Sequence, residues 1–188
     1  PAAEGARGDD EPRRHAPVLG GREGDGFKNA MDISVFSFVA LAKAYQPILN
    51  PGASLICMTY YGSVKVAPHY NVMGVAKAAL ESSTRYLAYD LGPQKIRVNA
   101  ISAGPIRTLA GAGINDARYM FAFQQKHSPL GRGVSLEDLG GSGLYLLSDL
   151  SSGVTGEIHF VDSGYNVIAM PQPDALRAEA TEAKDAAQ

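Results

Sequence analysis

Two tyrosines and a lysine near the middle of the chain have the types and the spacing for acid–base chemistry. Tyr60 follows a short apolar run, and Tyr70 lies seven residues before Lys77, which is about two turns of a helix. A phenol has an ordinary pKa of about 10. A nearby ammonium favours the phenolate, so it makes the phenol a better hydrogen-bond donor to an oxyanion that forms during a reaction. The same spacing also fits tyrosines packed at a strand end beside a solvated lysine.

Helix and strand signals alternate around these three residues. Apolar side chains recur at helical spacing in two long segments, and each segment ends at a Pro–Gly or Gly–Pro pair. Ser135 and Asp138 have the spacing of a capping box, which predicts the start of a third helix. The predicted helices are about residues 28–49, 72–91 and 136–148, and the predicted strands are 53–59, 96–102 and 157–161.

Strands separated by helices predict an α/β fold in which a parallel sheet carries helices on both faces. The nearly continuous apolar run at residues 53–59 is typical of a parallel strand that is buried on both faces. Ligands of such sheets bind beyond the carboxyl ends of the strands. We therefore expect the functional residues just after Thr59 and just after Ser102.

Composition divides the chain into a polar N-terminal segment, an apolar middle and a polar tail. Residues 1–26 carry many charges and glycines but almost no large apolar side chains, so we expect them to be disordered or unrelated to the rest. Residues 27–170 hold nearly all of the hydrophobic periodicity and are the expected folded domain. Residues 171–188 are rich in Ala, Glu and Lys, which predicts a solvated tail or a marginal helix.

Charge and residue counts exclude several classes of protein. A net charge of −2 and a pI near 6.1 argue against binding to nucleic acid or to an acidic membrane surface. No apolar run is long enough to span a membrane and no secretory signal is visible, so the expected location is the cytoplasm. The one cysteine, Cys57, lies in an apolar run and is expected in the core, and the spacing of the histidines predicts no metal site.

Six short motifs near the predicted strand ends are specific enough to indicate a family. They are TYYG at 59–62, PHYNVMGVAKAALE at 68–81, RVNAISAGPIRTLA at 97–110, LSDLS at 147–151, GVTGE at 153–157 and VDSGY at 161–165. Together these motifs resemble the bacterial NADH-dependent enoyl-acyl-carrier-protein reductases of the short-chain dehydrogenase/reductase superfamily. The resemblance covers about residues 27–170.

The spacing between tyrosine and lysine separates two branches of this superfamily. Most members use Tyr-x-x-x-Lys, and Tyr61 and Lys65 have that spacing. The superfamily's lysine, however, precedes the arginine of the Arg-Val-Asn strand by about twenty residues, and Lys77 meets that spacing to Arg97 whereas Lys65 does not. A Tyr-x6-Lys pair with a second tyrosine ten residues upstream resembles the enoyl reductases. The resemblance thus implies reduction of a carbon–carbon double bond, with a carbonyl reductase as the alternative.

The resemblance implies a role for each of the site residues. NADH would deliver hydride to the β-carbon of a trans-2-enoyl thioester carried by acyl-carrier protein, as in fatty-acid synthesis. Tyr70 would hydrogen-bond to the thioester oxygen, Lys77 would hold the nicotinamide ribose, and Tyr60 would line the pocket beside the acyl chain and assist in orientation or protonation. The implied cofactor contacts are Ile106, Arg107, Thr108, Leu109 and Ala110, with Thr108 near the phosphates, and the implied pocket walls are Met73 and Ile114.

One half of the family's cofactor site has no counterpart in this sequence. The resemblance begins near Arg22, so we expect a chain that lacks roughly the first ninety residues of a family member, including its first strands and the glycine-rich turn that binds pyrophosphate. Residues 20–26 are rich in glycine but follow no strand, which indicates a loop. The implied fold is the C-terminal part of a Rossmann-type doubly wound sheet, and the strand at residues 53–59 is its expected exposed edge.

The resemblance also implies self-association, because family members form homotetramers. The surfaces expected to pair are the two long helices near residues 28–49 and 71–91. The alternative to an active reductase is therefore a non-catalytic fragment that keeps these oligomerisation surfaces.

Overall fold

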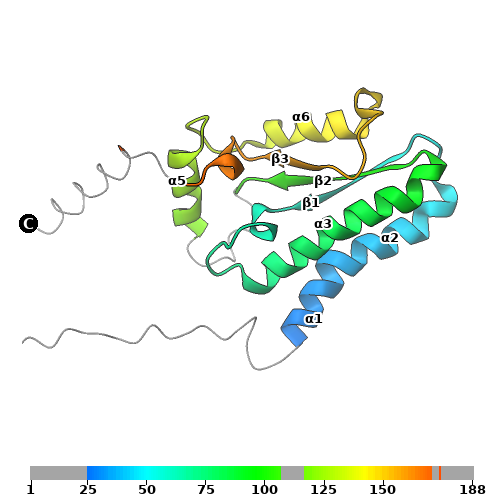
Figure 1. Ribbon diagram of the computed structural model, residues 1–188, viewed down its shortest axis with the longest axis horizontal. Coiled ribbons are helices and arrows are strands. Elements are labelled where there is room, and N and C mark those ends of the chain that lie inside the picture. Colours follow the sequence, from blue (N-terminus) through cyan, green and yellow to red (C-terminus); the bar gives the residue numbers. More distant parts are fainter. Residues whose placement is uncertain (1–24, 107–116, 171–173, 175–188) are drawn as a thin grey trace, which may run out of the picture.

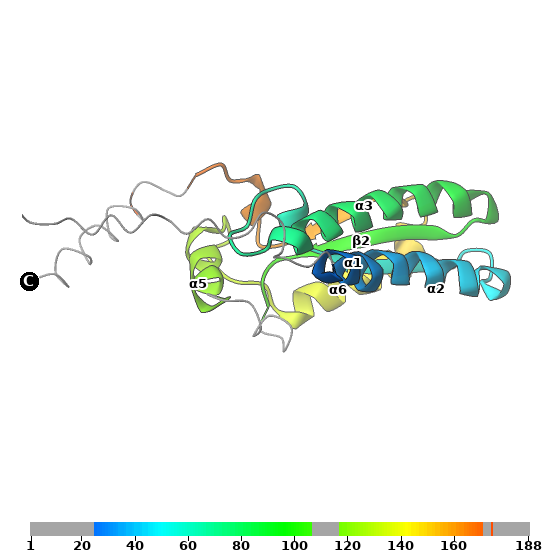
Figure 2. The ribbon, with the colours of Figure 1, turned by 90° about the horizontal axis from the view of Figure 1, so that it is seen from below.

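The computed structural model describes residues 25–106, 117–170 and 174. Within these ranges, three parallel strands form one sheet in the order β1-β2-β3, with helices on both faces (Figures 1 and 2). This arrangement confirms the predicted α/β fold. The strands are β1 (Ser54–Thr59), β2 (Arg97–Ala103) and β3 (Ile158–Val161), and the helices are α1 (Asp25–Met31), α2 (Ser37–Tyr45), α3 (Asn71–Leu91), α5 (Ala117–His127) and α6 (Leu136–Leu147).

The first predicted helix is confirmed, and it is longer than expected. Helix α1 continues through a π-helical segment, Asp32–Phe36, into α2 and then into a 3-10 turn, Gln46–Ile48. Asp25 and Gly26, which we expected in the disordered segment, are therefore helical. The helix at residues 72–91 is also confirmed, because α3 covers Asn71–Leu91 and ends at Gly92.

Strand β2 forms the centre of the core. Each of its residues is buried, and alternate side chains point to opposite faces. On one face Val98 packs with Ala88 and Leu91 of α3. On the other face Ile101 packs with Leu146 of α6. The two layers of helices therefore meet at this strand.

Strand β1 differs from the expectation that it is buried on both faces. It pairs only with β2 within the described residues, from Ser54 opposite Arg97 to Thr59 opposite Ser102. Most of its side chains are only partly buried, and Met58 is 45% exposed. An edge strand lacks cover on its unpaired side, so the expectation of an exposed edge is the one that holds.

Polar side chains of the Arg-Val-Asn motif bind the segment that follows α6. The Asn99 amide donates to the Val154 carbonyl at 3.0 Å, and the Glu157 N–H donates to the Asn99 amide oxygen at 3.0 Å. The buried Arg97 guanidinium donates to the carbonyls of Leu146 and Ser148, and to the Ser151 hydroxyl, at 2.7–3.0 Å. Arginine thus holds the carboxyl end of α6 against the sheet.

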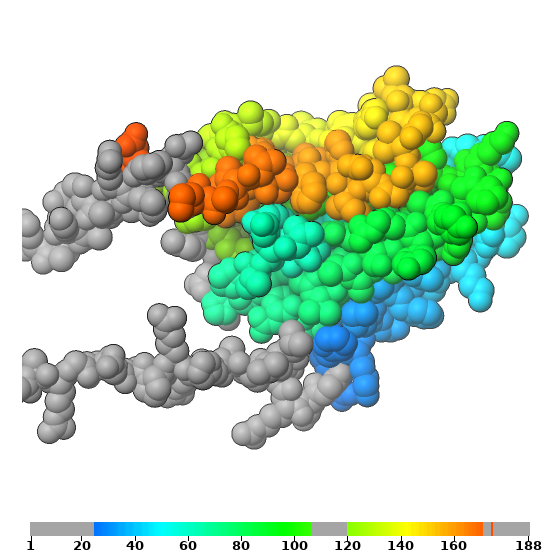
Figure 3. Space-filling model, viewed as in Figure 1, coloured from blue at the N-terminus to red at the C-terminus, as the bar shows by residue number. Residues whose placement is uncertain are grey.

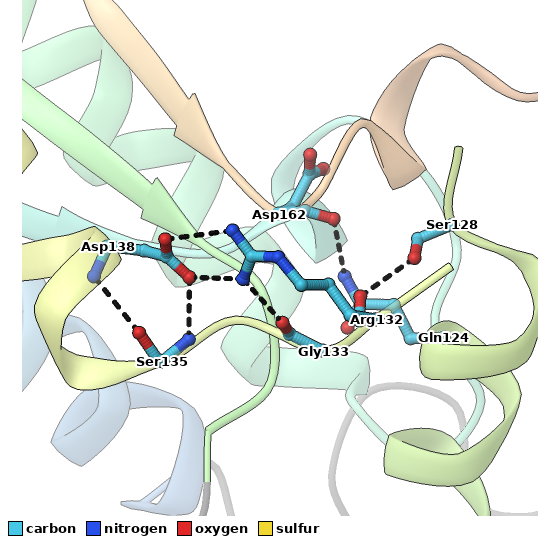
Figure 4. A network of polar contacts seen from close by, with 7 residues as sticks. All are labelled: Gln124, Ser128, Arg132, Gly133, Ser135, Asp138 and Asp162. Carbon is cyan, nitrogen blue, oxygen red and sulfur yellow. Dashed lines mark hydrogen bonds and ion pairs between the residues drawn. The ribbon is translucent and has the colours of Figure 1, made fainter. Parts of the chain in front are cut away.

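The amino end of α6 is fixed by the predicted capping box (Figure 4). The Asp138 N–H donates to the Ser135 hydroxyl at 3.1 Å, and the Ser135 N–H donates to the Asp138 carboxylate at 2.9 Å. The Arg132 guanidinium donates hydrogen bonds to both carboxylate oxygens of Asp138. These bonds hold the pKa of Asp138 well below its usual range. The connection between α5 and α6 therefore has a fixed path. In the described ranges, no helix has the length and apolar character needed to cross a membrane.

Candidate active site

A cavity of about 580 Å³ opens at the carboxyl ends of the strands. One lining residue follows each strand closely: Tyr60 after β1, Pro105 after β2 and Tyr165 after β3. Figure 3 shows the segments after β1 and β3, in turquoise and orange, lying side by side on one face. The cavity lies where the parallel topology predicts a ligand. Its other lining residues are Tyr61, Val66, Ala67, Pro68, His69, Met120, Phe123 and Gln124.

The two tyrosines that the sequence singled out are in contact. The Tyr60 and Tyr70 rings meet edge to face, with centroids 4.9 Å apart. Tyr60 follows β1 directly, and Tyr70 immediately precedes the first residue of α3, so the strand end and the helix start bring the phenols together. Two residues ten positions apart in the sequence are thus brought into ring contact beside the end of β1.

Further aromatic rings extend this pair around the cavity. Tyr165 packs on Tyr61 at a centroid distance of 5.7 Å and on Phe123 at 6.4 Å. The sequence analysis assigned no role to Tyr165. The available signal was the position of Tyr165, which comes just after the last predicted strand and so belongs at the same edge as Tyr60.

Lys77 lies on α3, two turns after Tyr70, as the spacing predicted. Its half-buried ammonium donates to the Met58 carbonyl at 2.8 Å, which attaches the helix to the end of β1. Burial lowers the pKa of Lys77, while the nearby Cys57 and Glu81 side chains raise it. The competing pair Tyr61 and Lys65 forms no comparable arrangement, because the Lys65 side chain is exposed.

The protonation of the phenols differs from the expectation that an ammonium favours the phenolate. Burial raises the pKa of Tyr70 to about 12, and Lys77 is not among the groups that shift it. Burial, with smaller contributions from neighbouring tyrosines, also raises the pKa of Tyr60 to about 12. At neutral pH both side chains are therefore uncharged phenols, each able to donate one hydrogen bond.

We expect Tyr60 and Tyr70 to resist ionisation until the solution is strongly alkaline. Their folded pKa values lie above the ordinary value of about 10, so the stability that they contribute is complete below pH 10. It is lost as the pH rises toward 12, because the unfolded chain releases protons that the folded chain retains. The pH at which the tyrosines ionise is measured by phenolate absorbance in the wild-type chain, in Tyr70→Phe and in the chain unfolded by guanidinium. Full ionisation of every tyrosine near pH 10 in the folded chain would contradict the burial of this pair.

Two glycines let the phenols approach each other. A Cβ atom on Gly62 would lie 2.6 Å from Cδ1 of Tyr70 and 3.1 Å from Cδ1 of Tyr60. A Cβ atom on Gly74 would lie 2.8 Å from the Gly62 carbonyl oxygen. Since Cβ atoms essentially never come closer than 3.0 Å to other heavy atoms, both positions are closed to any side chain unless the site shifts.

The remaining predicted site residues are only partly covered by the described structure. Ile106 follows the end of β2 and is half-buried. Met73 is half-buried on α3 and is not one of the residues lining the cavity, so its role stays a prediction. In the described part of the chain, no cluster of His, Cys, Asp and Glu could hold a metal ion. Arg107, Thr108, Leu109, Ala110 and Ile114 lie outside the described residues.

The sequence matches a known family and named members of it. The family model described as Enoyl-(Acyl carrier protein) reductase matches residues 12–166, starting before Arg22. Enoyl-(acyl-carrier-protein) reductase (NADH) 2 of Rhizobium meliloti is 63% identical over 153 residues, which are 81% of this chain and 57% of the relative. Enoyl-(acyl-carrier-protein) reductase (NADH) FabI of Escherichia coli is 53% identical over 146 residues, 78% of this chain and 56% of the relative. The chain thus spans a little over half the length of these relatives.

Solved structures of the same kind of enzyme share the fold. FabI from Candidatus Liberibacter asiaticus has a TM-score of 0.78 and 53% identity, covering 82% of this chain and 62% of that chain. The reductase from Anaplasma phagocytophilum, in complex with NAD, has a TM-score of 0.77 and 51% identity, covering 82% of this chain and 60% of that chain. The family match, the identities and the shared fold agree with the strand-end site described above, and they show that this chain belongs to the enoyl-(acyl carrier protein) reductase family.

Proposed function

We propose that this chain carries the catalytic part of a reductase that uses NADH to reduce trans-2-enoyl thioesters on acyl-carrier protein in fatty-acid synthesis. The observation that carries the proposal is the contact between two half-buried, neutral phenols, Tyr60 and Tyr70, of which Tyr60 lines the cavity at the strand ends, with Lys77 bound to the end of β1. The names of the relatives support this substrate and this cofactor, and the Anaplasma structure, which contains NAD, supports the cofactor.

Tyr60 lines a cavity large enough for the nicotinamide end of a dinucleotide, and Lys77 lies against the strand that precedes Tyr60. The cavity volume lies within the range of roughly 300–1,000 Å³ typical of small-molecule sites. The Lys77 ammonium gives one N–H to Met58 and has two more to offer to ribose hydroxyls. When bound, NADH supplies a hydride to the β-carbon of the enoyl group. Ile106, Arg107, Thr108, Leu109 and Ala110 are the proposed further contacts to the cofactor, with Thr108 near the phosphates.

Tyr70 is the proposed hydrogen-bond donor to the thioester oxygen. Negative charge develops on that oxygen during the reaction, and a neutral phenol in a half-buried position stabilises it more strongly than water does. The raised pKa keeps the proton on Tyr70, so it donates a hydrogen bond throughout the neutral range. Tyr60 packs on the Tyr70 ring, which restrains its orientation, and lines the cavity for the acyl chain. Met73 and Ile114 are proposed as further apolar wall.

Location and assembly belong to the same proposal. The single cysteine is a free thiol, which suits the reducing cytoplasm. Large apolar side chains are exposed along α2 and α3, including Leu41, Tyr86 and Tyr89, and such surfaces are typical of an interface between copies of a chain. A homo-oligomer is therefore the proposed assembly.

NADH binding and substrate choice test this function directly. We expect NADH fluorescence titration of the purified chain to show micromolar binding that Lys77→Ala abolishes and that Lys65→Ala, the change of an exposed lysine, leaves intact. With NADH, the chain should then reduce a crotonyl thioester and leave a ketoacyl thioester unreduced. Reduction of the ketoacyl thioester instead would identify a carbonyl reductase. No binding at millimolar NADH would identify a non-catalytic fragment.

A further inference from the structure

A buried acid on α3 has no place in the mechanism described so far. Glu81 is 4% exposed, although it carries a carboxyl group in the middle of the face that packs on β1. Its Oε1 accepts a hydrogen bond of 2.7 Å from the Thr59 hydroxyl, which is also 4% exposed. Burying a carboxyl group is costly unless hydrogen bonds or charges compensate for the lost water. The cost of burying Glu81 close to the candidate site indicates that this residue has a role there.

The position of Glu81 relates it to Lys77. The two residues are four apart on α3, so they lie one helical turn from each other on the same side. Lys77 donates to the carbonyl of Met58, and Glu81 accepts from the side chain of the next residue, Thr59. Two side chains one turn apart thus hold two consecutive residues of β1. The residue after them is Tyr60, so both bonds act on the strand end that carries a site phenol.

Charge connects the same two residues. Among the described residues, the groups whose charge shifts the pKa of Lys77 are Cys57 from β1 and Glu81 from its own helix. Burial raises the pKa of the Cys57 thiol, which therefore stays protonated and neutral at physiological pH. The carboxylate of Glu81 is then the group that offsets the burial of the ammonium, since an opposite charge favours the charged form of a lysine.

We propose that Glu81 is a positioning residue for Lys77. Anchored to β1 by Thr59, its carboxylate favours the ammonium form of Lys77 one turn away and holds α3 in register with the strand end that carries Tyr60. The use of Lys77 toward NADH rests on the proposed function, whereas the effect of Glu81 on the charge of Lys77 is a property of the chain by itself.

The decisive measurement is the titration of Lys77 by NMR of isotope-labelled lysine side chains, with the Lys77 signal assigned by its loss in Lys77→Ala. In Glu81→Gln, which keeps the size of the side chain and removes its charge, the pKa of Lys77 should shift downward from the wild-type value. Glu137→Gln removes a carboxylate from the exposed first turn of α6 and should leave that pKa unchanged. Equal Lys77 titrations in the two variants would overturn the proposal.

A second measurement covers the case in which Glu81→Gln does not fold. In the wild-type chain, the NMR signal of the Glu81 carboxyl carbon should move as Lys77 titrates, because coupled groups report each other's charge. Thr59→Ser keeps the donating hydroxyl and should preserve this coupling, whereas Thr59→Val removes the anchor and should weaken it. A Glu81 signal that ignores the Lys77 titration refutes the positioning role.

Cofactor binding separates this inference from the proposed function. Where the chain binds NADH, Glu81→Gln should weaken binding about tenfold as the pH rises into the range in which the altered Lys77 loses its proton, while Glu137→Gln should follow the wild-type profile. A shared absence of NADH binding in all variants would count against the proposed function. An unchanged Lys77 titration in Glu81→Gln would count against the positioning role.

Discussion

Replacing Arg97 by methionine is expected to lower the free energy of unfolding by about 3 kcal/mol. Methionine keeps a flexible apolar stem, so the loss falls on the hydrogen bonds rather than on the packing. The carbonyls of Leu146 and Ser148 lie where α6 ends, and both would lose a charged donor inside the protein. Denaturant unfolding measures the effect, and a fall in Tm of about 10 °C should accompany it.

Two further variants show whether hydrogen bonding is the cause. Arg97→Lys keeps the charge but has no fork of donors that reaches all the acceptors at once, so it should recover about half of the lost stability. Arg85→Met removes an exposed arginine from α3 and should stay within about 0.5 kcal/mol of the wild type. If Arg97→Met were as stable as Arg85→Met, apolar packing alone would hold the end of α6 on the sheet.

Local patterns in the sequence were enough to predict the elements of the fold. The helical spacing of apolar residues locates α3 within a residue or two, and Ser135 with Asp138 marks the start of α6 through its capping box. The parallel sheet follows from the alternation of helices and strands. These signals are predictable because each depends on residues close together in the chain. The π-helical segment inside the first helix left no such signal.

The polar interior could not be predicted, because it depends on partners far apart in the chain. The sequence marks Arg97 as part of a motif, but the acceptor at Leu146 is 49 residues away. Glu81 carries a carboxyl group, which usually lies at the surface, and the hydrogen bond that it accepts in the interior comes from the Thr59 hydroxyl, 22 residues away. The same limit applies to Tyr70. Its spacing to Lys77 suggested an acidified phenol, whereas the packing around the ring raises its pKa instead.

Gly62 lies against the tyrosine pair of the candidate site. Of the substitutions that add one methyl group at this site, Gly62→Ala is expected to be the most damaging. The added Cβ atom would lie 2.6 Å from Cδ1 and 3.0 Å from Cε1 of Tyr70, on the ring that Tyr60 also contacts. The chain cannot give way easily, because the Gly62 carbonyl approaches Gly74 on α3 closely. Overpacking of this kind costs about 2 kcal/mol of stability.

The displaced phenol should be visible without any substrate. When the Tyr70 ring moves toward water, its pKa falls from about 12 toward the ordinary value of about 10, so Gly62→Ala should ionise one tyrosine earlier in an alkaline titration. Gly140→Ala is the matched control, because a Cβ atom on that exposed residue of α6 meets nothing within 4 Å. It should leave the titration unchanged and add about 0.5–1 kcal/mol of stability, since alanine favours a helix.

Under the proposed function, enoyl reduction should respond to the same displacement. A donor moved by about 1 Å from the thioester oxygen costs roughly a hundredfold in rate, and most of the loss should appear in kcat, because the Lys77 contact to Met58 does not involve Gly62. If Gly62→Ala titrates and reacts like Gly140→Ala, the tyrosine pair tolerates an extra methyl group and its tight packing is not what orients Tyr70. If the titration shifts while the rate does not, the donor to the thioester oxygen is a group other than Tyr70.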